Sequence, residues 1–162
     1  MRDFQLPGRS PVIAENGLVS TSHPLASVTA LDVLKAGGNA ADAAVAAAAV
    51  LAVVEPQMTG IGGDCFAIVC LPDGRITGLD GAGRAAAEAD AAWYAENGFS
   101  EIPAHSAHSV TVPGMVRGWE TLLLVHGTMG LHQLMGDAIR YAEQGYAVAP
   151  RVARDWAKQA AT

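Results

Sequence analysis

The chain has 162 residues, of which 51% are hydrophobic and 16% charged, and its formal net charge is −6 at pH 7. This acidic balance, without any basic stripe or block, excludes nucleic acid and an anionic membrane surface as the main partner. Small residues supply much of the hydrophobic excess over a typical soluble domain. A piece of a larger protein, whose apolar faces need a partner, explains this composition better than a compact two-layer domain.

The N-terminal part predicts a lead-in, a strand and a helix. Residues 1–16 are expected to be irregular, and they lack the apolar stretch of a secretion signal. Gly17–Ser22 alternates enough to form a short strand. Ser27 is suited to cap the following helix, which should end at Gly37 and Gly38 because glycine readily adopts the backbone conformation of a helix C-terminus.

The most distinctive segment is a helix of small apolar residues, Ala40–Val54. It is apolar on all sides, so we expect it to be buried. Asn39 followed by Asp42 has the spacing of an N-cap with an acidic residue at the third helical position, and Pro56 ends the helix. The longest uncharged apolar run, Ala43–Val54, has 12 residues and is too short to span a bilayer.

A β-hairpin is predicted next in the chain. Cys65–Leu71 is almost continuously apolar, which is typical of a strand buried on both faces, and Ile76–Asp80 follows a Pro-Asp-Gly turn as the returning strand. Cys65 and Cys70 are five residues apart on one strand, so they point to opposite faces and should not pair. Unpaired cysteines favour a reducing compartment, and we expect a cytoplasmic protein.

Helices are predicted for most of the remaining chain. Trp93, Tyr94 and Trp119 lie on these helices and are interpreted as core anchors. Two strands framed by helices indicate an α+β fold in layers. The last helix has no visible cap or partner, which favours an incomplete chain. The expected helices are Ala86–Asn97, 113–126, Leu131–Gln144 and Val152–Ala161.

Four segments, in the same order, resemble the large-subunit signature of the gamma-glutamyltransferase (glutathione hydrolase) family: Gly17–Ser27, Leu34–Val69, Ser109–Trp119 and Ala138–Pro150. Members are N-terminal-nucleophile hydrolases. The resemblance therefore implies a four-layer αββα sandwich, of which residues 17–162 would form the N-terminal portion. One helical layer and part of the central sheets would be present, and the other half would be missing.

The resemblance also implies an activity whose nucleophile is absent from this chain. The family cleaves itself and uses the freed N-terminal Thr of its small subunit to attack a gamma-glutamyl amide, such as glutathione, without a metal or organic cofactor. The implied partners are that substrate and the missing C-terminal half. Thr21-Ser22-His23 is not an equivalent of this Thr segment, because Pro24 and a helix follow it instead of a strand.

One substrate-binding residue is implied, namely Arg84. An arginine in a D-x-R-E-x-A-P stretch after the hairpin grips the substrate's α-carboxylate in the family. Here the stretch is Asp80–Ala86, in which the arginine is displaced by two residues, the glutamate is absent and Ala86 replaces the proline. This departure fits a cephalosporin-acylase-like amidase equally well. Arg84 could also be a solvated loop residue, and the chain a non-catalytic truncated or scaffold protein.

Two further motifs are given structural interpretations. Gly60–Gly63 lacks the ending of a phosphate loop and leads from helix to strand, so it predicts tight backbone packing. Asp64 is expected to cap this turn, with a contact to the missing half as the alternative. His105 and His108 have a spacing that can bind metal on a helix, but they lie in a Ser- and Ala-rich loop without a cysteine cluster, so we predict no metal site.

Overall fold

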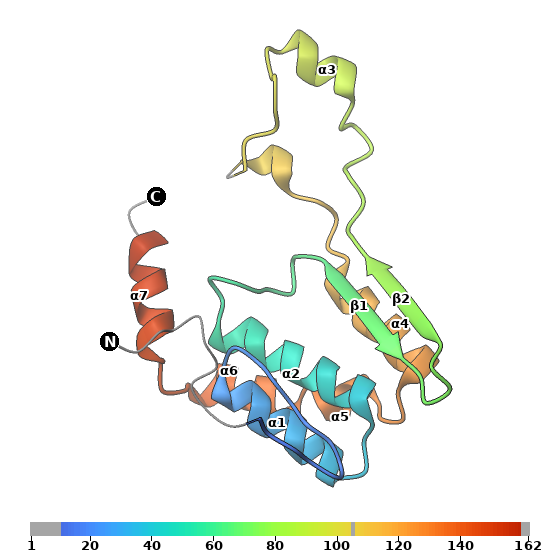
Figure 1. Ribbon diagram of the computed structural model, residues 1–162. Coiled ribbons are helices and arrows are strands. Elements are labelled where there is room, and N and C mark those ends of the chain that lie inside the picture. Colours follow the sequence, from blue (N-terminus) through green and yellow to red (C-terminus); the bar gives the residue numbers. More distant parts are fainter. Residues whose placement is uncertain (1–10, 105, 160–162) are drawn as a thin grey trace.

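The computed structural model describes residues 11–104 and 106–159, and Figure 1 shows their arrangement. Helices α1, α2, α5 and α6 pack together, and α4 lies between α2 and the hairpin of β1 and β2. The elements are α1 (Pro24–Lys35), α2 (Ala40–Val54), β1 (Cys65–Cys70), β2 (Ile76–Gly81), α3 (Ala91–Glu96), a 3-10 turn (Ala107–Ser109), α4 (Met115–His126), α5 (Leu131–Leu134), α6 (Gly136–Gln144) and α7 (Pro150–Gln159).

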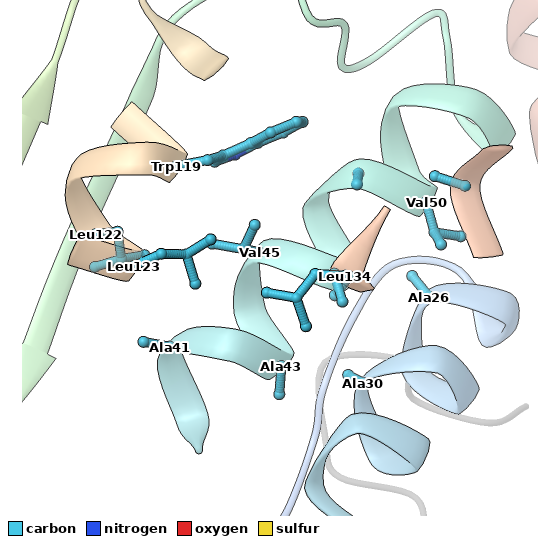
Figure 2. Packing of buried hydrophobic residues seen from close by; sticks show 14 of the residues in the cluster. Ala26, Ala30, Ala41, Ala43, Val45, Val50, Trp119, Leu122, Leu123 and Leu134 are labelled. Carbon is cyan, nitrogen blue, oxygen red and sulfur yellow. The ribbon is translucent and has the colours of Figure 1, made fainter. Parts of the chain in front are cut away.

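Helix α2 is the centre of the hydrophobic core, as its composition predicts. It packs against α1, α4, α5 and α6. Figure 2 shows it between α1, which contributes Ala26 and Ala30, and α4, which contributes Trp119 and Leu123. Its alanines allow the neighbouring helices to approach closely. Across the described residues, no helix is both long enough and apolar enough to cross a lipid bilayer.

A buried carboxylate joins the start of α2 to the end of α4. The predicted capping box is confirmed: the Asn39 side chain accepts from the backbone N–H of Asp42, and Asp42 accepts from the Asn39 N–H at 2.8 Å. Asp42 is fully buried and also accepts from the Thr128 N–H, the Thr128 hydroxyl and the Met129 N–H. Burial opposes its ionisation, but these hydrogen bonds, led by that of the Thr128 hydroxyl, hold the pKa of Asp42 below its usual value.

The hairpin forms as predicted, but only one of its faces is covered. Its strands pair antiparallel, from Cys65 opposite Gly81 to Cys70 opposite Ile76. Side chains of β1 alternate between half-buried and exposed, so the prediction of burial on both faces is wrong for this chain. Helix α4 covers one face, while on the other Phe66 and Ile68 are 68% and 83% exposed. Both cysteines are free, and they lie on opposite faces as expected.

The start of the described chain differs from the prediction. No strand forms at Gly17–Ser22, because no other strand of the described residues lies beside it to share backbone hydrogen bonds. Helix α1 begins at Pro24, with His23 rather than Ser27 as its N-cap. Proline suits the first helical position, where its missing N–H is not needed. Ser27 instead lies within α1, and its hydroxyl is hydrogen-bonded to that of Thr21 at 2.6 Å.

The helices beyond the hairpin differ from the prediction mainly in their bounds. Asp90 caps α3, which covers only Ala91–Glu96 of the expected 86–97, and the expected 131–144 helix breaks at Met135 before Gly136, a weak helix former. The predicted 113–126 helix is present as α4, which begins at Met115 rather than Pro113. Helix α7 begins at Pro150 rather than Val152, and residues 160–162 lie outside the described part.

The segment between β2 and α4 projects from the body and carries α3 at its far end (Figure 1). The predicted role of Trp93 as a core anchor is wrong, since Trp93 is 46% exposed and packs edge-on against Tyr94 in a local cluster with Phe99 and His108. Trp119, in contrast, is a core anchor as predicted, with 2% of its surface exposed. The projecting segment thus has an aromatic cluster of its own outside the main core.

Asp42 should be among the most sensitive positions for stability. We expect Asp42→Ala to lower the free energy of unfolding of the protein by about 3 kcal/mol, because three donors of Thr128 and Met129 lose a buried charged acceptor and α2 loses half of its capping box. Urea denaturation followed by circular dichroism measures this. Asp32→Ala is the matched control, since Asp32 forms only an exposed ion pair with Lys35 at 3.2 Å and should change stability by less than about 0.5 kcal/mol.

The contribution of Asp42 also has a defined pH dependence. Because its folded-state pKa is lowered, its stabilisation is complete above the unfolded-state pKa of about 4 and is lost as the pH falls through the folded-state value. The stability difference between the wild type and Asp42→Asn should therefore be constant near neutral pH and shrink below about pH 4. A difference that grows on acidification would contradict this account.

Candidate substrate-binding site

Arg84 lies in the loop that leaves the end of β2, at the rim of a cavity between this loop and the start of α4. Its side chain is exposed, and its guanidinium has no hydrogen-bond partner among the described residues. The cavity has a volume of about 400 Å³, and Arg117 of α4 lines it as well. Arg117 is largely exposed and pairs with Glu120 at 3.3 Å. Two arginines therefore face one open cavity, and Arg84 is the one without a carboxylate partner in the described chain.

Four glycines bring three backbone segments into direct contact beside this cavity. A Cβ on Gly81 would lie 2.6 Å from the carbonyl oxygen of Cys65, and one on Gly118 would lie 2.8 Å from the Cβ of Cys65. A Cβ on Gly83 would meet the Val112 carbonyl, and one on Gly114 the Gly81 carbonyl. No other residue type fits such contacts without displacing backbone. Figure 1 shows the resulting juxtaposition of the end of β2 with the start of α4.

The predicted tight packing at Gly60–Gly63 is wrong. A Cβ on Gly60 or Gly62 would meet nothing within 4 Å, and one on Gly63 would make only an ordinary contact. This turn runs along the surface of the described chain, where its Ile61 side chain is 59% exposed. Close packing occurs instead around Gly81 and Gly83 and around Gly114 and Gly118, two pairs that lie far apart in the sequence. Spacing along the chain therefore gave no signal for this contact.

Gly63, the last residue of this turn, and Asp64, which follows it, instead form hydrogen bonds with distant parts of the chain. The carbonyl oxygen of Gly63 accepts from the N–H groups of Gly114 and Met115, at 3.0 and 2.9 Å, where α4 begins. Asp64 does not cap its own turn. Its Oδ1 accepts from the Gly83 N–H at 2.7 Å and from the Thr111 hydroxyl at 3.4 Å. Sequence reasoning missed this role, because the donors are 19 and 47 residues away.

The hydroxyls of Thr21 and Ser22 have structural roles near the start of α1. The Thr21 hydroxyl donates to the carbonyl oxygen of His23 at 2.8 Å, and the Ser22 hydroxyl donates to the Glu55 carboxylate at 2.5 Å. Both hydroxyls therefore belong to the hydrogen bonds around the start of α1, and a helix rather than a strand follows Thr21-Ser22-His23. That this segment is not the nucleophile segment stays a prediction.

The histidine pair with metal-binding spacing is only half described. His105 lies outside the described residues. The ring of His108 packs 5.0 Å from that of Phe99 and 5.4 Å from that of Tyr94, within the aromatic cluster of the projecting segment. Across the described residues, no group of three or more His, Cys, Asp or Glu side chains is placed to hold a metal ion.

Comparison with known proteins identifies the family. Residues 26–162 match the family model described as gamma-glutamyltranspeptidase. The chain belongs to the gamma-glutamyltranspeptidase family. The predicted fold is confirmed as well, because its structural neighbours are N-terminal-nucleophile hydrolases of this family, and the chain forms a partial α+β segment of them.

Three relatives illustrate the breadth of the family. The glutathione hydrolase proenzyme of a Pseudomonas species (strain A14) is 42% identical and matches 85% of this chain but 24% of its own length. The gamma-glutamyltranspeptidase of Helicobacter pylori is 39% identical, with a TM-score of 0.81 over 90% of this chain and 42% of that one. The cephalosporin acylase of Bacillus halodurans is 40% identical, with a TM-score of 0.79 over 93% of this chain and 29% of that one. The chain spans about a quarter of the length of the curated relatives it matches.

The glycine contacts predict a position-specific cost of adding one methyl group. We expect Gly114→Ala to lower the free energy of unfolding by roughly 2 kcal/mol, because the new Cβ would push the Arg84 loop away from α4. Gly62→Ala should stay within about 0.5 kcal/mol of the wild type, since nothing lies within 4 Å of its Cβ position. Thermal or urea denaturation of both variants measures the effect. Equal stability of the two variants would show that α4 and the loop carrying Arg84 are not in close backbone contact at Gly114.

Proposed function

We propose that this chain is the N-terminal portion of an enzyme that hydrolyses or transfers gamma-glutamyl groups from glutathione or a related amide. The observation that carries the proposal is Arg84, an exposed guanidinium on a loop whose backbone is anchored on both sides. Family membership and a relative named as a glutathione hydrolase support it. We assign residues 17–162 to the segment that forms one wall of the site.

In this proposal Arg84 binds the α-carboxylate of the gamma-glutamyl group. A guanidinium presents two parallel N–H donors that match the two carboxylate oxygens, and such a charged pair fixes orientation as well as affinity. The nucleophile would be an N-terminal Thr in the part of the protein beyond this chain. It would attack the amide carbonyl and release the amine, and water or an amino acid would then resolve the acyl-enzyme. This chain thus orients the substrate and leaves the bond-breaking step to the other half.

The proposed partner is the C-terminal half of the same precursor. The uncovered hairpin face supports this, because Phe66, Ile68 and Ile76 expose large apolar side chains on one side of the sheet. The name proenzyme for a relative supports a precursor that is processed. We also propose that the protein works in the reducing cytoplasm, and the two free cysteines support this.

A second candidate is an amide acylase with the same fold. The observation that favours it is the stretch Asp80–Ala86, in which Arg84 follows Gly83 and no glutamate follows the arginine. Similarity to a cephalosporin acylase at 40% identity supports it too. Initial rates on matched gamma-glutamyl and glutaryl amides would separate the two, because only the former offers an α-carboxylate with an adjacent amine.

The function is tested on the protein produced from its complete reading frame. We expect self-cleavage that exposes an N-terminal Thr, identified by N-terminal sequencing, and hydrolysis of gamma-glutamyl p-nitroanilide. Residues 1–162 produced alone should be inactive. A reading frame that stops at Thr162, or activity from residues 1–162 alone, would contradict the proposal, and the former would favour a non-catalytic scaffold protein.

Arg84 is expected to act on substrate binding. Arg84→Ala should raise KM for gamma-glutamyl p-nitroanilide about 30- to 100-fold with little change in kcat, because it removes a charged bidentate contact worth about 2–3 kcal/mol. Arg84→Lys should give an intermediate KM because lysine cannot form the fork. Arg75→Ala is the control, since Arg75 pairs with Asp73 in the hairpin turn and is 73% exposed. An unchanged KM for Arg84→Ala would remove Arg84 from the site.

A further inference from the structure

The loop that carries Arg84 has two long-range backbone anchors, one on each side of its Cα. On one side, the Gly83 N–H donates to Asp64 Oδ1 at 2.7 Å. On the other, the Arg84 carbonyl oxygen accepts from the Val112 N–H at 2.9 Å. The Arg84 side chain itself is exposed and contributes no described hydrogen bond. The point from which the Arg84 side chain leaves the loop is therefore set by these two backbone hydrogen bonds. Of the two partners, only Asp64 contributes a side chain, which mutation can remove.

Asp64 is itself held in place by the fold. Its neighbour Gly63 accepts two hydrogen bonds from the first backbone N–H groups of α4, which fixes the turn against that helix. A single carboxylate oxygen of Asp64 then accepts from both Gly83, just after β2, and Thr111, shortly before α4. The path of contacts runs from α4 through Gly63 and Asp64 to Gly83, the residue before the arginine.

We propose that Asp64 is a positioning residue that pre-organises Arg84 for binding a carboxylate of the substrate. Asp64 does not touch the substrate in this account. It accepts a charge-assisted hydrogen bond from the Gly83 N–H and so restricts the directions in which the guanidinium can point. Binding to a loop that is already ordered avoids the entropy cost of ordering it at that moment. The inference rests on the proposed role of Arg84.

Three variants separate this role from a merely structural one. Asp64→Ala removes the acceptor. Asp64→Asn keeps an oxygen of the same size in the same place, able to accept from Gly83 and Thr111, and should rescue the function. Asp73→Ala is the matched control, because Asp73 also accepts a backbone N–H, at 3.0 Å, but in the exposed hairpin turn away from the site.

The experiment uses the complete protein and gamma-glutamyl p-nitroanilide as the probe. We expect Asp64→Ala to raise KM about tenfold with kcat changed less than about threefold, while Asp64→Asn and Asp73→Ala remain close to the wild type. In the Arg84→Ala background, Asp64→Ala should cause no further loss of kcat/KM, because its effect passes through Arg84. Backbone hydrogen exchange over residues 81–86 should accelerate in Asp64→Ala but not in Asp64→Asn.

The possible outcomes distinguish this inference from the proposed function. If backbone hydrogen exchange over residues 81–86 is unchanged in Asp64→Ala, Asp64 does not anchor the loop that carries Arg84. Faster exchange with an unchanged KM, or additive losses in the double variant, overturns the route through Arg84. If the wild-type protein has no activity on gamma-glutamyl p-nitroanilide, the proposed function is overturned instead. Hydrogen exchange in Asp64→Ala and Asp64→Asn then tests by itself whether Asp64 anchors the loop.

Discussion

The candidate site depends on a crossing of backbones that only glycine permits. The end of β2 and the loop that carries Arg84 lie against the backbone at the start of α4 at Gly81, Gly83 and Gly114, and Gly118 of α4 lies against Cys65 at the start of β1. A protein interior transmits displacement because it is close-packed. A shift of α4 would therefore move the loop that presents Arg84, and the positions of helix and arginine are coupled.

Helix α4 also connects this crossing to the core. Its C-terminal end meets the start of α2, where Asn39 donates to the carbonyl oxygen of His126 and Asp42 accepts from residues 128 and 129. Its N-terminal end is fixed by the carbonyl oxygen of Gly63. Both ends of α4 are thus held by residues of Leu34–Val69, one of the four segments that resemble the family.

Local signals predicted the elements whose cause is local. The capping spacing of Asn39 and Asp42, the apolar run of α2 and the turn of the hairpin each act within a few residues, and all three are present in the structure. What failed depends on partners distant in sequence. One face of β1 is open because α4 covers only the other, and Gly17–Ser22 has no neighbouring strand among the described residues.

The candidate site, too, could be predicted only in part from the sequence. Resemblance to the family pointed to Arg84, but the residues that hold its loop could not be found from spacing, because Asp64 meets donors 19 and 47 residues away. Likewise, tight backbone packing was predicted at Gly60–Gly63. The close contact forms instead between Gly83 and Gly114, at the two ends of the projecting segment. Such contacts arise from the topology of the whole chain, which no local pattern encodes.

The most direct test of the central claim is the structure of the complete protein with glutamate bound. The account predicts a distance of about 3 Å between the guanidinium nitrogens of Arg84 and the α-carboxylate oxygens of the ligand, as in a charge-assisted bidentate pair. A bound glutamate whose α-carboxylate is held by another cation, with Arg84 directed into solvent, would contradict it.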